Sequence, residues 1–171
     1  MPQVKIEKSS KELKFYTKDE LSQLFSYVES LESGQWSNEY FKALLRVLVA
    51  TGVRIGEAMA LSWSDIDLDN QTISVSKTTV QRVMIQDTPK TDKSNRVITI
   101  DSKAVLSLKR WYLFQKKHFM SLGNPQQKLV FPSYKGKVKD YNHVTKFLKD
   151  CEEAAGLPVL SFHGFRHSHA S

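Results

Sequence analysis

The sequence predicts an α+β fold that is mainly helical, with a small three-stranded antiparallel sheet between two groups of helices. Three observations support this prediction. Apolar residues recur at helical spacing before about residue 61 and again after residue 101. Three short segments between them alternate apolar and polar residues, as half-buried strands do. The length of 171 residues is enough for one domain with its own core.

Two helices are predicted near the N-terminus. Thr17 is suited to be the N-cap of the first, and Glu20, three residues later, completes a capping box. Gly34 ends this segment, and the second helix starts near Ser37. The second helix is apolar on most sides, so we expect it to be buried. The apolar positions are Leu21, Leu24, Phe25 and Val28 in the first helix and Tyr40, Phe41, Leu44, Leu45, Leu48 and Val49 in the second.

A short helix and the strands follow. Gly52 interrupts the second helix, and a short helix is expected from about Arg54 to Leu61. The loop over residues 88–95 is rich in turn-forming residues and lysine. The three segments with strand character are 65–76, 78–87 and 96–100, and we expect them to pair as an antiparallel meander.

The last part of the chain is again helical. Residues 102–122 predict a long amphipathic helix with a basic face, and residues 139–156 predict another that ends at Gly156. Residues 157–171 predict a loop and the start of a further helix. We therefore assign residues 1–14 to a linker or N-terminal extension and residues 15–171 to the domain.

The charge of the chain is unevenly distributed. Residues 1–76 hold 8 Lys and Arg against 11 Asp and Glu, whereas residues 77–171 hold 17 against 7. The basic half is where an anionic polymer would bind, although a solvated lysine surface explains the same composition.

No signal peptide and no stretch of 18 apolar residues is found, and Cys151 has no partner cysteine. These features lead us to expect a cytoplasmic protein without a membrane segment.

Arg54 and Lys90 are the first candidate site residues. Arg54 is surrounded by apolar residues, which is costly for a guanidinium without a partner. It either pairs with Glu57 as a structural salt bridge or is a half-buried guanidinium that offers a planar, permanently charged fork to a phosphate. Lys90 lies in the turn-rich loop and, taken alone, indicates an exposed surface lysine.

The C-terminal stretch SFHGFRHSHAS collects three histidines and an arginine. His163 and Arg166 are three residues apart and share one face if a helix begins there. A metal site at His163, His167 and His169 is less favoured, because no Cys or Glu lies nearby. Two arginines, a histidine and a lysine together form a set that can hold a phosphodiester and supply a proton to a leaving oxygen.

Three segments resemble the tyrosine recombinases, the phage integrase family. Residues 50–67 resemble the first conserved box of that family, residues 89–100 its strand hairpin with a lysine, and residues 161–171 its second box. The three matches occur in the order of the family and extend over residues 15–171. The resemblance implies the catalytic-domain fold of DNA breaking-rejoining enzymes.

The resemblance also implies a reaction and roles. The family cuts one DNA strand with a tyrosine, forms a 3′-phosphotyrosyl link and uses no metal or other cofactor. By position, Arg54 and Arg166 clamp the scissile phosphate, Lys90 protonates the leaving 5′-oxygen, His163 handles a proton and Glu57 orients its neighbours. Double-stranded DNA is the implied partner, with a tetramer on paired sites. The implied processes are DNA recombination and integration by a phage or mobile element.

The sequence departs from the family pattern at its end. In the family a further His or Trp and the nucleophilic tyrosine follow the second box, whereas all six tyrosines here precede it. We therefore expect a partial catalytic domain that lacks the nucleophile and is inactive by itself. Two other functions remain open at this stage, a DNA-binding module or recombination regulator without chemistry and a metal-dependent hydrolase.

The cations expected to contact the DNA backbone are Lys109, Arg110, Lys116, Lys117, Lys135, Lys137 and Lys139.

Overall fold

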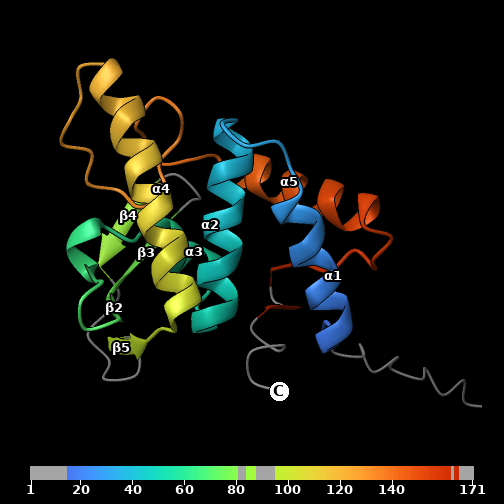
Figure 1. The fold of residues 1–171 in the computed structure, drawn as a ribbon. Helices are drawn as coiled ribbons and strands as arrows, with labels where there is room; N and C mark the ends of the chain where they lie inside the picture. The colour runs from blue at the N-terminus through green and yellow to red at the C-terminus, as the bar shows by residue number, and fades with distance from the viewer. Residues whose placement is uncertain (1–14, 81–83, 88–94, 163, 166–171) are drawn as a thin grey trace, which may run out of the picture.

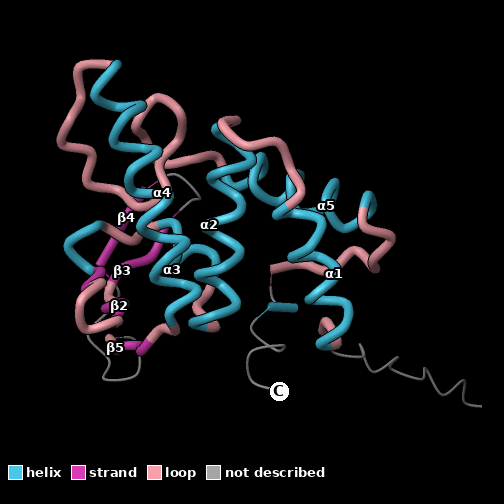
Figure 2. The backbone as a smooth tube through the Cα atoms, viewed as in Figure 1, coloured by secondary structure: helices cyan, strands magenta, loops and turns pink. Residues whose placement is uncertain are grey.

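The computed structural model describes residues 15–80, 84–87, 95–162 and 164–165. In this part of the chain, helices form most of the molecule and the strands gather at one side (Figure 1, Figure 2). The helices are α1 (Lys18–Glu29), α2 (Trp36–Thr51), α3 (Ile55–Met59), the 3-10 turn η1 (Trp63–Asp65), α4 (Ser102–Ser121) and α5 (Tyr141–Ala154). The strands are β1 (Ile66–Asp67), β2 (Thr72–Val75), β3 (Lys77–Val80), β4 (Met84–Asp87) and β5 (Arg96–Thr99). The mainly helical α+β architecture that the sequence predicts is confirmed.

The capping box and the glycine after α2 are confirmed, whereas the first helix ends at Glu29 and not at Gly34. Thr17 accepts a hydrogen bond from the Glu20 amide at 3.2 Å, and the Glu20 carboxylate accepts one from the Thr17 amide at 2.9 Å. Gly52 ends α2 with φ of 66°, a left-handed conformation that a side chain would strain. Asp101, which the sequence analysis did not single out, caps α4 by accepting from the Ala104 amide at 2.9 Å.

The strands pair differently from the expected meander. A three-stranded antiparallel sheet has the order β1-β2-β5, with Ile73 of β2 opposite Ile98 of β5. The segment predicted as a single strand over residues 78–87 instead contributes β3 and β4, which pair with each other as a separate antiparallel unit. The small three-stranded antiparallel sheet is thus confirmed, but the predicted meander pairing was wrong. Alternation of apolar and polar residues shows which face a residue occupies, and it carries no information about the partner strand.

Helix α2 forms the centre of the core. It packs against α1, α3 and α4, and its buried side chains run around most of its surface, as its sequence predicts. Trp111 of α4 donates from Nε1 to the carbonyl of Val130 at 2.6 Å, and Gln115 donates to the same oxygen at 2.9 Å. These bonds fix the segment after α4 against the core. Among the described residues, none of the helices combines the length and apolar composition that crossing a bilayer requires.

Candidate functional site

Arg54 occupies the corner between α2 and α3. Gly52 turns the chain out of α2, Val53 is buried beside it, and Arg54 then takes an extended conformation as the N-cap of α3. The Arg54 side chain is exposed and forms no ion pair within the part of the chain that the structure describes. The expectation of a half-buried guanidinium was wrong, because the corner directs this side chain to solvent while Val53 enters the core.

Glu57 lies under this corner, and its partner is Arg96. The Glu57 side chain is 6% exposed and receives two parallel hydrogen bonds from the Arg96 guanidinium, at 2.9 and 3.1 Å. The amide of Arg54 donates a third to Glu57 at 3.0 Å. The alternative of a structural Arg54–Glu57 salt bridge is therefore replaced by an Arg96–Glu57 pair.

The ionisation of Glu57 follows from these contacts. Burial by itself raises the pKa of this carboxyl, but the hydrogen bonds from Arg96 and from the Arg54 amide, with the charges of both guanidinium groups, outweigh burial and lower it. Glu57 is thus held as a carboxylate whose charge Arg96 already neutralises. The Arg54 guanidinium forms no ion pair with this carboxylate.

Gly56 brings α3 against strand β3. A Cβ at this position would lie 2.9 Å from Oγ1 of Thr78, closer than Cβ atoms normally come to another atom, and 3.1 Å from Oγ1 of Thr79. The base of the β3–β4 pair is therefore adjacent to the Arg54 corner, and Arg96 joins β5 to the same corner through Glu57. Asp87 and Arg96 are the strand residues nearest in sequence to Lys90, which itself lies outside the described residues.

The segment that leads to the second box is anchored on Glu152 of α5. Glu152 is fully buried, its Oε1 accepts from the Leu160 amide at 3.1 Å, and Tyr16 donates its hydroxyl to the same oxygen. Among the residues that the structure describes, its Oε2 has no hydrogen-bond partner. Burial raises the pKa of this carboxyl, and the two hydrogen bonds only partly oppose that rise. The Tyr16 ring also packs on Phe165, with centroids 5.0 Å apart.

These contacts fix the residues on both sides of His163. Phe162 and Phe165 are buried, and the Phe165 amide donates to the carbonyl of Phe162 at 3.2 Å. His163 and Arg166 lie outside the described residues, so their side chains are not placed. Of the five catalytic candidates, the structure describes Arg54 and Glu57 and brings them to one corner.

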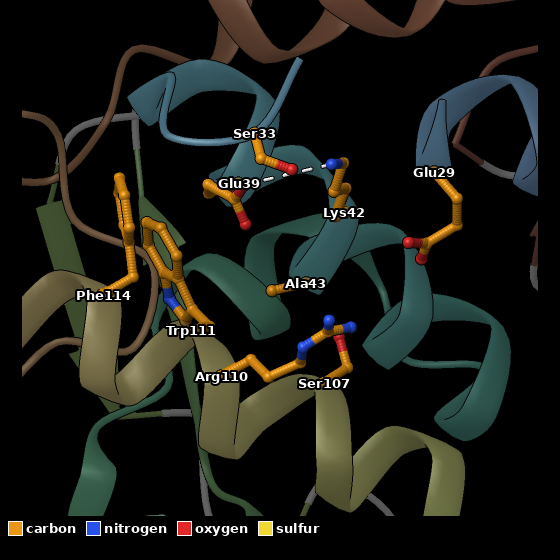
Figure 3. A pocket seen from close by; sticks show the side chains of 9 residues that line it. All are labelled: Glu29, Ser33, Glu39, Lys42, Ala43, Ser107, Arg110, Trp111 and Phe114. Atoms are coloured by element: carbon orange, nitrogen blue, oxygen red, sulfur yellow. Dashed lines mark ion pairs between the residues drawn. The ribbon is translucent and has the colours of Figure 1, made fainter. Parts of the chain in front are cut away.

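The cations expected to contact DNA fall into three groups. Those of α4 are exposed, and Arg110 also lines a pocket of about 360 Å³ with Glu29, Glu39 and Lys42 (Figure 3). Lys135 and Lys137 are exposed in the loop before α5. Lys139 differs from the rest, because its Nζ lies 5.0 Å from the centre of the Tyr40 ring and burial lowers its pKa. The α4 group is Lys109, Arg110, Lys116 and Lys117.

Two polar contacts near the corner were not anticipated from the sequence. Arg96 was assigned only to a strand, although a buried Glu57 requires a cation and could have directed attention to it. Lys77 at the start of β3 binds Asp65 and the Ser62 hydroxyl, both at 2.8 Å. This contact ties β3 to η1, and no sequence signal other than opposite charge indicates it.

Most tyrosines of the chain make packing contacts with other side chains. Tyr16 and Tyr40 are buried, and burial raises the pKa of both hydroxyls far above the usual range. Tyr112 packs on Trp63 and Tyr134 packs on His118. Among the described residues no group of three or more His, Cys, Asp or Glu could hold a metal ion, and the terminal histidines lie outside that search.

The fold and this corner define a helical α+β domain with an exposed arginine beside a carboxylate that a second arginine neutralises. Comparison with known proteins agrees with this description and identifies the family. Residues 14–171 match the model of the phage integrase family, and the chain belongs to this family.

Two relatives and one solved structure illustrate the similarity. The ICEBs1 integrase of Bacillus subtilis (strain 168) is 30% identical over 165 residues, which are 94% of this chain and 43% of that protein. The integrase of Staphylococcus phage L54a is 30% identical over 193 residues, covering 98% of this chain and 53% of its own. The Tn1549 transposon integrase, in complex with transposon right end DNA, superposes with a TM-score of 0.73 at 19% identity, over 96% of this chain and 54% of that one. The chain thus spans about half the length of these proteins.

Proposed function

We propose that this chain is part of the catalytic domain of a site-specific DNA recombinase, which cuts and rejoins DNA through a 3′-phosphotyrosyl intermediate. The proposal rests on family membership and on one observation. Arg54 is exposed at the corner between α2 and α3, and Glu57, the carboxylate beside it among the described residues, is already bound by Arg96. A guanidinium held in this way can bind two phosphate oxygens and stabilise the charge that develops on them.

The remaining roles are assigned by position in the family motifs. Arg166 completes the phosphate clamp, Lys90 protonates the leaving 5′-oxygen and His163 handles a proton. Glu57 acts indirectly, because its hydrogen bonds to the Arg54 amide and to Arg96 join α3 to β5. Leu160 and Phe165, on either side of His163 in the sequence, are themselves anchored by Glu152 and Tyr16.

We propose that the attacking tyrosine is supplied from outside these 171 residues. All six tyrosines precede the second box, and two of them are buried with hydroxyl groups whose pKa is raised. A nucleophile must reach the phosphate and lose its proton, and a buried tyrosine does neither readily. Residues 15–171 are then a partial catalytic domain.

Double-stranded DNA is the proposed substrate. The half of the chain after residue 76 carries the excess of Lys and Arg, and Lys135 and Lys137 are exposed for contact with phosphates. The α4 cations add to the positive field that attracts DNA. A DNA complex of the structurally similar Tn1549 integrase supports this assignment. Assembly as a tetramer on paired sites and a cytoplasmic location complete the proposal.

Covalent capture of DNA tests the function. In a full-length protein that contains this chain, a nicked suicide substrate should trap a protein–DNA adduct, whereas the 171-residue chain alone should trap none. Arg54→Ala should slow cleavage by roughly 10²–10³, the usual loss for one charged donor to a transition state. Arg54→Lys should also be slow, because a point charge does not replace a bidentate fork. Wild-type cleavage rates in both arginine variants would refute the assignment.

The role of Lys90 has its own test. Lys90→Ala should slow cleavage, and a substrate with a 5′-bridging sulfur should restore much of the rate, because a thiolate leaves without protonation. The same substrate should not rescue Arg54→Ala. Equal rescue of both variants would show that Lys90 is not the general acid.

A DNA-binding module without chemistry is the second candidate function. It shares the fold and the basic half and differs only in forming no adduct in the full-length protein. Its DNA affinity should be insensitive to Lys90→Ala, since binding does not need a general acid. An adduct in the full-length protein decides for the recombinase.

A further inference from the structure

Three apolar side chains form a line on the outside of α4. Leu106, Leu113 and Met120 are 58%, 66% and 58% exposed, and they are spaced seven residues apart. Since an α-helix advances about 100° per residue, they lie on one stripe about 21 Å long. We refer to these three residues as the α4 ridge. Single exposed apolar residues need no explanation, but an aligned set indicates a contact surface.

The ridge faces away from the molecule. The buried side of α4 is formed by Ala104, Leu108, Trp111 and Gln115, which pack toward α2 and the segment after α4. The ridge lies nearly opposite that side on the helix circumference. Figure 1 shows α4 at the front of the molecule, with none of the described segments drawn across it. Packing in the core of this domain therefore does not explain why these three positions are apolar.

Cations border the ridge on both sides. Lys109 and Lys116 lie along one edge, and Lys103, Arg110 and Lys117 lie along the other; all five are exposed. The 20 residues of α4 include neither Asp nor Glu. The surface is thus an apolar line with heptad spacing between two rows of positive charge, the arrangement that pairs with an amphipathic helix of opposite charge.

We propose that the α4 ridge is the docking site for an acidic amphipathic helix of a partner protein. Apolar residues of the partner at heptad spacing would cover the ridge, and carboxylates beside them would meet the two rows of cations. The proposal goes beyond recombination chemistry, because α4 is not an element of the Arg54 corner. It assigns the exposed face of this helix to a protein partner that binds away from the scissile phosphate.

Other occupants fit the surface less well. A second copy of α4 would place five cations opposite five, which is repulsive. Residues 1–14 carry four Lys and two Glu and do not complement the surface either. A DNA backbone would use the cations but would leave three exposed apolar side chains against phosphates, where they gain nothing.

A designed peptide pair tests the proposal. The probe is a fluorescent 21-residue helix with Leu at heptad positions and Glu beside them, and the control peptide has the same composition with the heptad order scrambled. In anisotropy titrations of the 171-residue chain, the ordered peptide should bind at least tenfold more tightly than the scrambled one. Equal binding of both peptides would reduce the surface to nonspecific attraction between charges and overturn the proposal.

Substitutions locate the contact. The triple variant Leu106→Gln, Leu113→Gln, Met120→Gln keeps helix-forming residues and should weaken the ordered peptide at least tenfold. The control Val159→Gln, at a loop residue that is 51% exposed, should leave binding unchanged. If the triple variant loses its cooperative thermal transition, Leu113→Gln alone replaces it, with an expected loss of at least threefold.

The competing occupants have separate readouts. Binding of a 20-base-pair duplex should be the same for the wild type and the triple variant, and both should sediment as the same species. Loss of duplex binding in the triple variant would assign the ridge to DNA. A wild-type dimer that the triple variant abolishes would assign it to a second copy, and either result would overturn the proposal.

Discussion

Removing the Arg96 side chain should destabilise the fold far more than its position in an edge strand suggests. Arg96→Ala leaves the Glu57 carboxylate, 6% exposed, without the two hydrogen bonds that hold it. Breaking a buried pair from one side costs about 3–5 kcal/mol. Arg96 is 33% exposed, so water replaces part of the loss, and we expect about 2–3 kcal/mol. For a chain of this size that lowers Tm by roughly 5–10 °C.

The matched control is an ion pair at the surface. Lys146 binds Asp150 at 2.7 Å, but the two side chains are 72% and 55% exposed. Lys146→Ala should therefore cost less than about 0.5 kcal/mol. Urea unfolding of both variants measures the difference. If Arg96→Ala costs no more than Lys146→Ala, the Glu57–Arg96 pair does not anchor the corner.

The pH dependence of the same variant gives an independent check. The pKa of Glu57 is lowered in the folded protein, so its pairing stabilises the fold above the ordinary glutamate pKa and is lost as pH falls through the lowered value. In Arg96→Ala the hydrogen bonds and the charge of Arg96 no longer oppose the effect of burial on the pKa of Glu57, so this carboxyl is protonated more readily. The difference in free energy of unfolding between wild type and variant should therefore be largest near neutral pH and should become smaller below about pH 4.5. A gap that is constant with pH would refute this reasoning.

Four further predictions concern the packing of the corner, the buried carboxyl of Glu152 and the charge of the chain. Gly56→Ala should cost about 1–3 kcal/mol because its Cβ would lie 2.9 Å from Oγ1 of Thr78, and adding Thr78→Ala should restore part of the loss in urea unfolding. Tyr16→Phe removes a donor to buried Glu152 and should cost about 1–3 kcal/mol, whereas Tyr112→Phe should change stability by less than about 0.5 kcal/mol; equal costs would refute the role of the hydrogen bond. The pKa of Glu152 is raised, so its ionisation destabilises the fold as pH rises past the ordinary glutamate value, and Glu152→Gln should remove that decline. Duplex DNA binding should weaken steeply with salt, with a log–log slope of about −0.9 per neutralised phosphate, and a flat anisotropy response would contradict DNA binding by the basic half.

Much of this protein is determined by local sequence. The capping box of Thr17 and Glu20, the glycine that ends α2 and the nearly uniform apolar surface of α2 all predict what the structure contains. These signals are readable because each depends on residues within a few positions of one another. The family motifs are also local, and they place Arg54 and Glu57 in one short segment.

Which residues and strands pair with one another was decided by the tertiary structure. Arg96 lies 39 residues from Glu57, and Tyr16 lies 136 residues from Glu152, so no pattern along the chain joins them. The pairing of β2 with β5, and of β3 with β4, likewise depends on which strand edges meet. From its charge and burial, one can predict only that a buried carboxylate needs a hydrogen-bond donor. The residue that supplies the donor is determined by the packing of elements that are distant in sequence. Packing likewise decided that Glu57, which the sequence places three residues from Arg54, pairs with Arg96 instead.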